Sequence, residues 1–143
     1  MSQRALRLAT AVLALAGIGI AGYLTWVHYK DIDPVCVGGG GGCEIVQASR
    51  WAELAGLPVA LLGLIAYVTV LASLAPPEEP GRAVAAFVTL VGFGFSAWLT
   101  YVELVEIEAI CQWCVASAVV MTGLALVSLA RMMRGAGHGA LAA

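Results

Sequence analysis

Charged side chains are scarce in this sequence. Asp, Glu, Lys and Arg make up only 11% of its 143 residues, whereas 62% are hydrophobic and the mean hydropathy is +0.95. Because a soluble domain carries roughly 25% charged residues, this composition excludes an ordinary water-soluble domain. We expect membrane lipid to surround the chain, and we expect no nucleic-acid partner.

Four apolar runs are long enough to cross a membrane. A transmembrane helix needs about 20 mainly apolar residues to span the ~30 Å hydrocarbon core. The runs predict an all-α membrane protein, a four-helix transmembrane bundle with an outer cap of loop and short helix at about residues 30–56. We expect a single domain over residues 1–134 and a disordered tail at residues 135–143. The predicted spans are residues 8–27, 57–75, 83–101 and 110–129.

The first run follows Arg4 and Arg7, as the apolar part of a secretory signal peptide would. However, its roughly 20 apolar residues exceed the ~7–15 of such a peptide. Tyr23, Trp26 and Tyr29 stand where a cleavage site with small residues would be needed. We therefore interpret this run as a permanent span.

The basic residues are distributed unevenly between the two sides of the predicted bundle. Basic residues concentrate in the loops that stay in the cytoplasm. The side that holds both termini carries five of the seven basic residues, so we expect this side to be cytoplasmic. All cysteines would then lie on the extracytoplasmic side of a plasma or inner membrane, where disulfides persist. These five residues are Arg4, Arg7, Arg82, Arg131 and Arg134.

Cysteine is also rare, and the four cysteines form two unequal pairs. Cys36 and Cys43 bracket six residues, five of them glycine, whereas Cys111 and Cys114 form a Cys-Gln-Trp-Cys tetrad at the start of the fourth run. Two cysteines three apart at a helix start share one face, and the helix N-terminus favours the thiolate that attacks disulfides. The glycines predict a mobile loop that can close a disulfide or open. The pattern indicates a mobile relay pair and a fixed pair within reach of a lipid-soluble molecule.

Two other interpretations of the cysteines stay open. A non-enzymatic four-span protein would use them as structural disulfides, and a metal site would use all four cysteines as ligands. Zinc sites prefer two tight Cys-x(2–4)-Cys pairs, and the spacing from Cys36 to Cys43 is too long. We therefore expect no metal.

Outside the cysteines, few residues indicate chemistry. Glu103, Glu106 and Glu108 lie in a short connection before the tetrad, and we expect them to be solvated charges at the headgroup level. His28 is expected to be an interface residue. The tryptophans are expected to pack, to lie at the membrane interface or to line a pocket for a flat ring. They are Trp26, Trp51, Trp98 and Trp113.

With these residues in place, the sequence resembles the vitamin K epoxide reductase family, in particular its stand-alone prokaryotic members. The resemblance covers about Arg4 to Arg134 and rests on the order of the features. These are a span, the loop cysteine pair, Ser49 six residues after Cys43, Gly-Leu-Pro58 before the second span, and Cys-Gln-Trp-Cys before the fourth.

The resemblance implies a membrane thiol–disulfide oxidoreductase that supports disulfide bond formation. Cys111 and Cys114 would be the active-site pair, with Cys114 nearest a membrane quinone of the ubiquinone or menaquinone type. Cys36 would exchange with a thioredoxin-like extracytoplasmic carrier, and Cys43 would bridge transiently to Cys111. Ser49 matches a family serine that helps to organise the quinone site.

The sequence departs from the family pattern at two positions of the quinone site. Family members that hold the vitamin K headgroup have an asparagine in span two and a tyrosine one turn after the tetrad. Here the second span has no asparagine, and Ala118 stands in the place of the tyrosine. We therefore expect an ordinary membrane quinone rather than vitamin K epoxide. The chain shows no thioredoxin-like segment, so we expect the carrier to be a separate protein. A rival with the same chemistry is the bacterial disulfide bond protein B type, which also has four spans and two cysteine pairs. Its Cys-x-x-Cys pair comes first in the sequence, the reverse of the order here, which favours the resemblance to the vitamin K epoxide reductase family.

Overall fold

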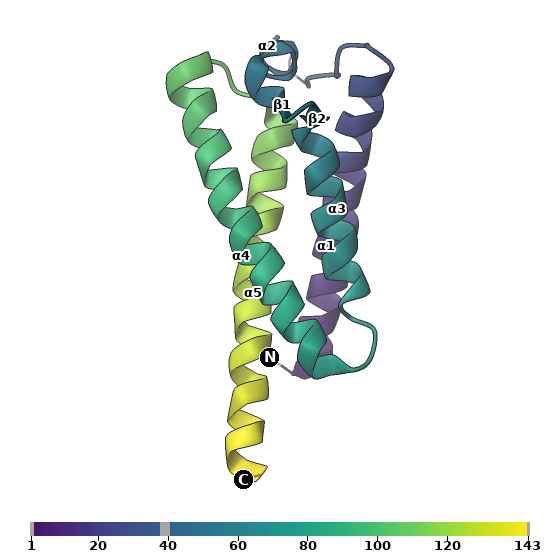
Figure 1. Cartoon of the computed structure of the whole chain (residues 1–143), viewed down its shortest axis with the longest axis vertical. Coiled ribbons are helices and arrows are strands. Elements are labelled where there is room, and N and C mark those ends of the chain that lie inside the picture. The colour runs from purple at the N-terminus through teal and green to yellow at the C-terminus, as the bar shows by residue number, and fades with distance from the viewer. Residues whose placement is uncertain (1, 38–40, 143) are drawn as a thin grey trace.

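The apolar runs of the sequence fold into long helices that pack side by side, and short elements cover one end of them (Figure 1). The computed structural model describes residues 2–37 and 41–142. In chain order the elements are α1 (Gln3–Tyr29), α2 (Gly42–Ala48), η1 (Arg50–Ala52), β1 (Glu53–Leu54), β2 (Leu57–Pro58), α3 (Val59–Ala72), α4 (Glu78–Val102), η2 (Glu103–Ile107) and α5 (Gln112–Ala142).

Within the residues that the structure describes, three helical segments are long and apolar enough to cross a membrane: Gln3–Tyr29, Glu78–Ile107 and Gln112–Gly139. The remaining predicted span, residues 57–75, contains α3, which has only 14 residues. It begins late because Leu57 and Pro58 form the second strand of a hairpin with Glu53 and Leu54, and it ends before Ser73. At 1.5 Å per residue, α3 is about 21 Å long. The chain is a mostly helical membrane protein, and the count of four spans stays a prediction.

Small residues allow the long helices to approach one another closely. A side chain on Gly17 of α1 would overlap the ring of Tyr67 on α3, and one on Gly92 of α4 would meet Met121 of α5. Gly94, by contrast, has open space where a side chain would be. Within membranes, helices associate through such close contacts. The buried core of the bundle includes Ala14, Ala21, Tyr67, Val70, Met121 and Leu124.

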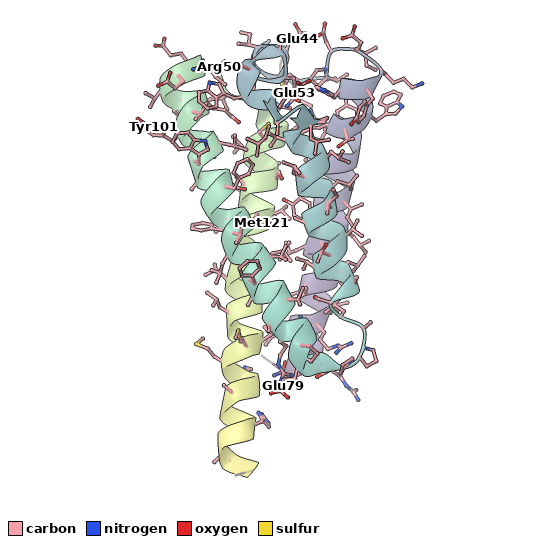
Figure 2. All side chains as sticks on the ribbon, in the orientation of Figure 1. Glu44, Arg50, Glu53, Glu79, Tyr101 and Met121 are labelled. Carbon is pink, nitrogen blue, oxygen red and sulfur yellow. A yellow bond between two sulfur atoms is a disulfide. The ribbon has the colours of Figure 1, made fainter. Side chains whose placement is uncertain are left out.

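Apolar side chains also cover the outside of the bundle, whereas charges gather at its ends. In Figure 2, Glu44, Arg50 and Glu53 lie at the end that carries α2, and Glu79 lies at the opposite end. An apolar exterior is costly in water but suits lipid. Exposed side chains on the long helices include Leu8, Val12, Leu15, Phe87, Val91, Val119 and Leu126.

A short cap covers the end of the bundle where α1 ends and α5 begins. Its hairpin pairs Glu53 with Pro58 and Leu54 with Leu57. The two turn residues, Ala55 and Gly56, both have positive φ angles (55° and 83°), as tight hairpin turns require. The Nε2 atom of His28 lies 3.1 Å from a carboxylate oxygen of Glu53, so the hairpin is tied to the end of α1.

The last helix runs further than the sequence analysis expects. Residues 135–142, predicted to be disordered, continue α5 as far as Ala142. A helix that is already formed extends without a second nucleation cost, and alanines in this segment favour it, although each glycine opposes it by about 1 kcal/mol. In Figure 1 this extension projects beyond the other helices.

Candidate active site

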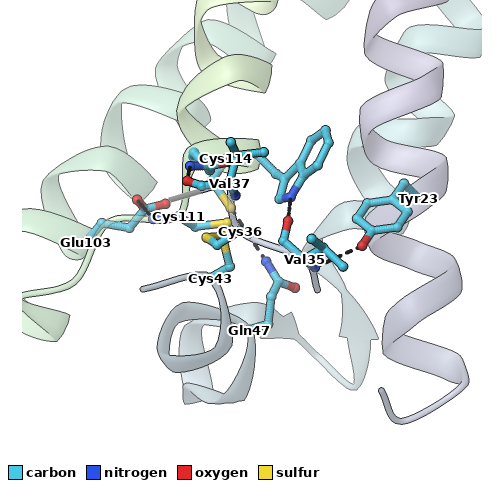
Figure 3. The surroundings of a disulfide bond; sticks show 11 residues. Tyr23, Val35, Cys36, Val37, Cys43, Gln47, Glu103, Cys111 and Cys114 are labelled. Carbon is cyan, nitrogen blue, oxygen red and sulfur yellow. Dashed lines mark hydrogen bonds between the residues drawn. A yellow bond between two sulfur atoms is a disulfide. The ribbon is translucent and has the colours of Figure 1, made fainter. Parts of the chain in front are cut away.

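The four cysteines meet in a single cluster under the cap (Figure 3). Cys36, in the loop after α1, forms a disulfide with Cys43 in the first turn of α2, and their Cα atoms are 6.0 Å apart. Cys111 immediately precedes α5, Cys114 lies in its first turn, and both are free thiols. Folding therefore brings together two pairs that are 68 residues apart in the sequence, from Cys43 to Cys111.

The cysteines differ in what they can reach. Cys36 is partly exposed, whereas Cys43 and Cys111 are both 0% exposed and pack in the same cluster. Of the four cysteines, only Cys114 lines the apolar cavity between the cap and the helices. A reagent from outside can therefore meet Cys36, and a molecule in the cavity can meet Cys114, while the two enclosed sulfurs connect them.

The two central residues of the tetrad hold the loop that carries Cys36. The Gln112 side chain receives a hydrogen bond from the amide of Val37 and donates one to its carbonyl, both 2.8 Å long. Trp113 donates through Nε1 to the carbonyl of Val35 (2.7 Å), whose amide in turn donates to the hydroxyl of Tyr23 (2.9 Å). The sequence alone indicates no role for Gln112, because nothing in a Cys-x-x-Cys spacing shows which backbone lies opposite.

We predict that Gln112→Ala loosens this loop. Two hydrogen bonds are lost, and together they stabilise the closed loop by about 1–2 kcal/mol, so reduction of the Cys36–Cys43 disulfide by dithiothreitol should become about tenfold faster. Lys30→Ala, an exposed change just after α1, is the matched control and should leave the rate unchanged. An unaltered rate in Gln112→Ala would show that the two bonds do not restrain the loop.

Part of the glycine run has a packing role. Gly41 has a φ angle of 65° and caps α2, and a side chain on Gly42 would collide with the carbonyl oxygen of Ile110, just before the tetrad. These two glycines therefore let α2 approach the start of α5. Gly38–Gly40, for which the sequence analysis predicts mobility, lie outside the described residues.

Glu103 differs from the expectation of a solvated charge, because it is only 4% exposed. The π-helical turn η2 continues α4 and directs this side chain back towards the tetrad, where Oε2 accepts a hydrogen bond from the amide of Cys111 (3.2 Å). Its carboxyl group also lies within hydrogen-bonding reach of the Cys114 thiol. Glu106 and Glu108 are exposed, as expected. A change from α to π geometry over one turn has no clear signature in the sequence, so Glu103 could not be told apart from its neighbours.

Cys111 lies ahead of α5 and outside the three candidate spans. The thiol of Cys114 donates a hydrogen bond to its sulfur, and this lowers the pKa of Cys111 from its ordinary value of 9.0 to about 7. A thiolate at Cys111 is the form that attacks a disulfide, so the reduced tetrad is reactive at neutral pH.

A cavity of about 370 Å³ opens beside Cys114, between the cap and helices α3, α4 and α5. Its lining is mainly apolar and aromatic, and it includes Trp51, Phe87 and Phe95. Gln47, which also lines it, donates to the sulfur of Cys114 over 3.5 Å. Ligand pockets range over ~300–1,000 Å³ and combine apolar walls with a few polar groups. The cavity therefore fits a flat, mainly apolar ring placed next to one thiol.

Tyr67 brings a polar group to the wall of this cavity, one helical turn after Cys114 along α5. Its ring is buried, and its hydroxyl donates to the carbonyl of Ser117 over 2.9 Å and lies 2.7 Å from the Ser117 hydroxyl. Ala118 is the next residue of the lining. The sequence alone does not indicate this position of Tyr67, because a tyrosine inside an apolar run gives no sign of the face it occupies.

Ser49 lies at the end of α2, and its hydroxyl donates to the carbonyl of Val46 over 2.7 Å. Among the described residues, those that line the cavity do not include Ser49. A place for Ser49 in the quinone site therefore stays a prediction, and the structure gives it a contact that ends α2.

An open groove of about 490 Å³ lies on the outer side of the disulfide. Cys36 and Val37 line it together with Ile45 and Ile110, which are both exposed. Glu108 lines its edge, and Glu106 is exposed close by in the sequence. The groove thus presents one sulfur of the disulfide on an apolar surface with an acidic edge.

The fold and this cluster define a helical membrane protein in which two cysteine pairs meet beside an apolar cavity. Residues 8–129 match the model of the vitamin K epoxide reductase family. The chain belongs to this family, whose members are oxidoreductases of membranes and use a quinone as electron acceptor. The resemblance noted in the sequence is thereby confirmed.

Proposed function

We propose that the chain oxidises a thioredoxin-like carrier and passes the electrons through its two cysteine pairs to a membrane quinone, which supports disulfide bond formation. The observation that carries the proposal is the order of the four sulfurs. Cys36 faces the outer groove, Cys43 and Cys111 are enclosed together, and Cys114 lines the cavity.

We further propose a four-span bundle as a single domain over residues 1–134. The short α3 would complete its crossing with the flanking residues at 57–58 and 73–75, or through local thinning of the bilayer, which accommodates short spans. All four cysteines would face the extracytoplasmic side of a plasma or inner membrane. Support for this orientation comes from Arg4, Arg7, Arg82 and Arg131, which lie towards the end away from the cysteines.

The first step takes place in the outer groove. A thiolate of the carrier attacks the sulfur of Cys36, and Cys43 leaves as a thiolate. The second thiol of the carrier then attacks its own bridged cysteine and releases Cys36. The carrier departs as a disulfide, and the loop pair has gained two electrons. The apolar floor and acidic edge of the groove favour a carrier whose reactive cysteine has apolar and basic surroundings.

The second step transfers the electrons inwards. The thiolate of Cys43 attacks Cys111 in an oxidised tetrad, and Cys114 leaves as a thiolate. Cys36 then attacks Cys43, so the loop disulfide forms again and Cys111 is released. The product has an oxidised loop pair and a reduced tetrad, which is the arrangement of bonds found in the structure. Little movement is needed, because Cys43 and Cys111 pack in one cluster.

The last step needs an acceptor in the cavity. A quinone supplies the capacity to take up two electrons and two protons. Trp51 would hold its ring, and Gln47 orients the sulfur of Cys114. Phe95 and Phe87, about 12 and 24 Å from Glu103 along the helix, would contact its apolar tail.

Glu103 would receive the proton of the Cys114 thiol and pass it to the quinone. The second proton would come from Cys111 when it is a thiol, and from solvent when it is a thiolate. The two sulfurs give up two electrons as they join in the tetrad disulfide. Ala118 in the lining and the lack of an asparagine in α3 support a ubiquinone or menaquinone, rather than vitamin K epoxide, as the proposed acceptor.

The test is an assay of the purified chain in detergent with a reduced thioredoxin-like protein and a soluble ubiquinone or menaquinone analogue. We expect one quinol for each carrier disulfide formed. In the double variant Cys36→Ala/Cys43→Ala, a small dithiol should still drive quinone reduction through the tetrad, whereas the carrier should not.

Metal analysis and thiol titration of the same sample address the non-enzymatic alternative. The disulfide leaves two thiols in the cluster, and the described residues include no group of three His, Cys, Asp or Glu that could hold a metal. Stoichiometric zinc with no quinol formation would overturn the proposed function.

A further inference from the structure

A second polar site lies at the end of the bundle away from the cysteines. There the first turns of α1, the first turns of α4 and the later part of α5 come together (Figure 1). Arg131 of α5 is only 2% exposed, and its Nε and Nη1 atoms have no hydrogen-bond partner among the described residues. Ser128, one turn earlier on the same helix face, is 1% exposed, and its hydroxyl also lacks a partner in the described part of the chain.

The neighbouring charges do not neutralise Arg131. The charged groups close to it are Arg7, Arg82 and Glu78. Glu78 forms ion pairs with both Arg7 and Arg82, and Arg7 also donates to the carbonyl of Leu74 over 2.8 Å. One carboxylate is therefore shared by two guanidinium groups, and the third has none. The cluster has two positive charges in excess, in surroundings where an unpaired buried charge is expensive.

The unpartnered groups have the chemistry of an oxyanion site. Guanidinium groups and a hydroxyl are hydrogen-bond donors, and arginine binds phosphate oxygens with particular strength. The edge of the cluster is accessible at Arg7 and Arg82, whose side chains are 35% and 18% exposed. Arg131 and Ser128 lie covered behind this edge, so the Arg131 side chain must turn towards it to reach a phosphate. Gly135 helps to form this edge, since a side chain there would overlap the Arg82 guanidinium.

The depth of the cluster indicates where such an anion comes from. Arg131 lies 19 residues after Gln112 on one continuous helix, which is about 28 Å at 1.5 Å per residue. The hydrocarbon core is ~30 Å thick. With the tetrad at one membrane surface, Arg131 lies at the hydrocarbon edge of the opposite leaflet, where a long side chain can extend to the headgroup phosphates.

We propose that Arg131 and Ser128, with Arg7 and Arg82, form a phosphate-binding site that takes the phosphate group of a membrane lipid from the leaflet away from the cysteines. The site is separate from the redox centre and does not depend on the proposed electron transfer. Phosphate bound there would compensate the excess positive charge and join α1, α4 and α5.

Thermal unfolding in a phosphate-free, uncharged detergent tests the site. The probes are phosphatidylglycerol, a galactolipid without phosphate, and inorganic phosphate. We expect phosphatidylglycerol to raise the Tm of the full chain by about 5–10 °C more than the galactolipid does, as ligand at about 100 times its Kd would. An equal rise with inorganic phosphate alone would retain the site but overturn the lipid as its source.

The matched variants are Arg131→Met, which keeps an unbranched side chain but removes the charge, and Arg134→Met, an exposed arginine on the same helix. Arg131→Met should lose the shift caused by phosphatidylglycerol, and Arg134→Met should keep it. If Arg131→Met does not fold, Ser128→Ala should still show a shift reduced by about half. The proposal is overturned if phosphatidylglycerol and galactolipid act alike, or if the shift is the same in Arg131→Met or Ser128→Ala as in the unmodified chain.

Discussion

Replacing Cys114 with alanine should abolish quinone reduction, with a loss of about 1,000-fold or more, because the tetrad can then no longer close to a disulfide and release two electrons. Cys114 is the one cysteine that lines the cavity, so no other thiol can take its place. The measurement is quinol formation from a small dithiol. Ser117→Ala, a small change in the same lining, is the matched control and should keep most of the activity.

The same variant should also trap the internal bridge. Without Cys114, the thiol of Cys111 can attack Cys43 and release Cys36, which exchanges one disulfide for another and needs no oxidant. Peptide mass mapping under non-reducing conditions should therefore find Cys43 joined to Cys111. Loss of the Cys114 thiol also removes the hydrogen bond that lowers the pKa of Cys111, so this exchange should need a higher pH than in the unmodified chain. Retained quinone reduction in Cys114→Ala would contradict the proposed electron path.

Glu103→Gln should slow quinone reduction by about 100-fold. Glutamine is close in size and keeps an oxygen that can accept the hydrogen bond from the amide of Cys111, but it cannot take up a proton. Loss of a positioned general acid–base group typically costs roughly 10²–10⁴-fold in rate. The Tm should change little, which separates a catalytic effect from a structural one.

The matched control for this variant is Glu106→Gln, in the same turn but exposed. It should leave the rate and its pH profile unchanged, whereas Glu103→Gln should alter the pH dependence of kcat. If both variants behave alike, Glu103 serves only to hold the amide of Cys111.

The sequence predicted the long helices well because their signal is local. An apolar run long enough to cross a membrane forms helix wherever it lies, since lipid offers its backbone no other partner. The limits of the helices were predicted less well. The helix predicted over residues 57–75 is shorter at both ends, because Leu57 and Pro58 belong to the hairpin and a turn begins at Ser73. By contrast, α5 is longer than predicted and continues past Gly135. Both differences arise because glycine and proline only bias the backbone, and neighbouring structure decides whether a helix continues.

The sequence predicted which functional groups act together only where their spacing along the chain indicates it. The tetrad and the loop cysteines were recognisable from their positions, and the structure places all four in one cluster. The burial of Glu103 depends on a π-helical turn, and the roles of Gln112 and Trp113 depend on which loop lies across from them. For Arg131, the sequence predicted only that it lies on the basic side of the membrane. That it has no partner among the described residues depends on Glu78, which binds Arg7 and Arg82 instead.

By itself, the sequence determined that this chain lies in a membrane, that it carries two unequal cysteine pairs, and which family it resembles. These conclusions follow from composition and from spacing along the chain, which no folding event can change. Only the tertiary structure decided that Cys36 lines the open groove and that Cys114 lines the cavity. It also decided that Glu103 is buried beside the tetrad, and that Arg131 at the other end has no partner among the described residues. Such features depend on contacts between distant helices, and the free energy of burying a charge or a thiol is set by those contacts rather than by its neighbours in sequence.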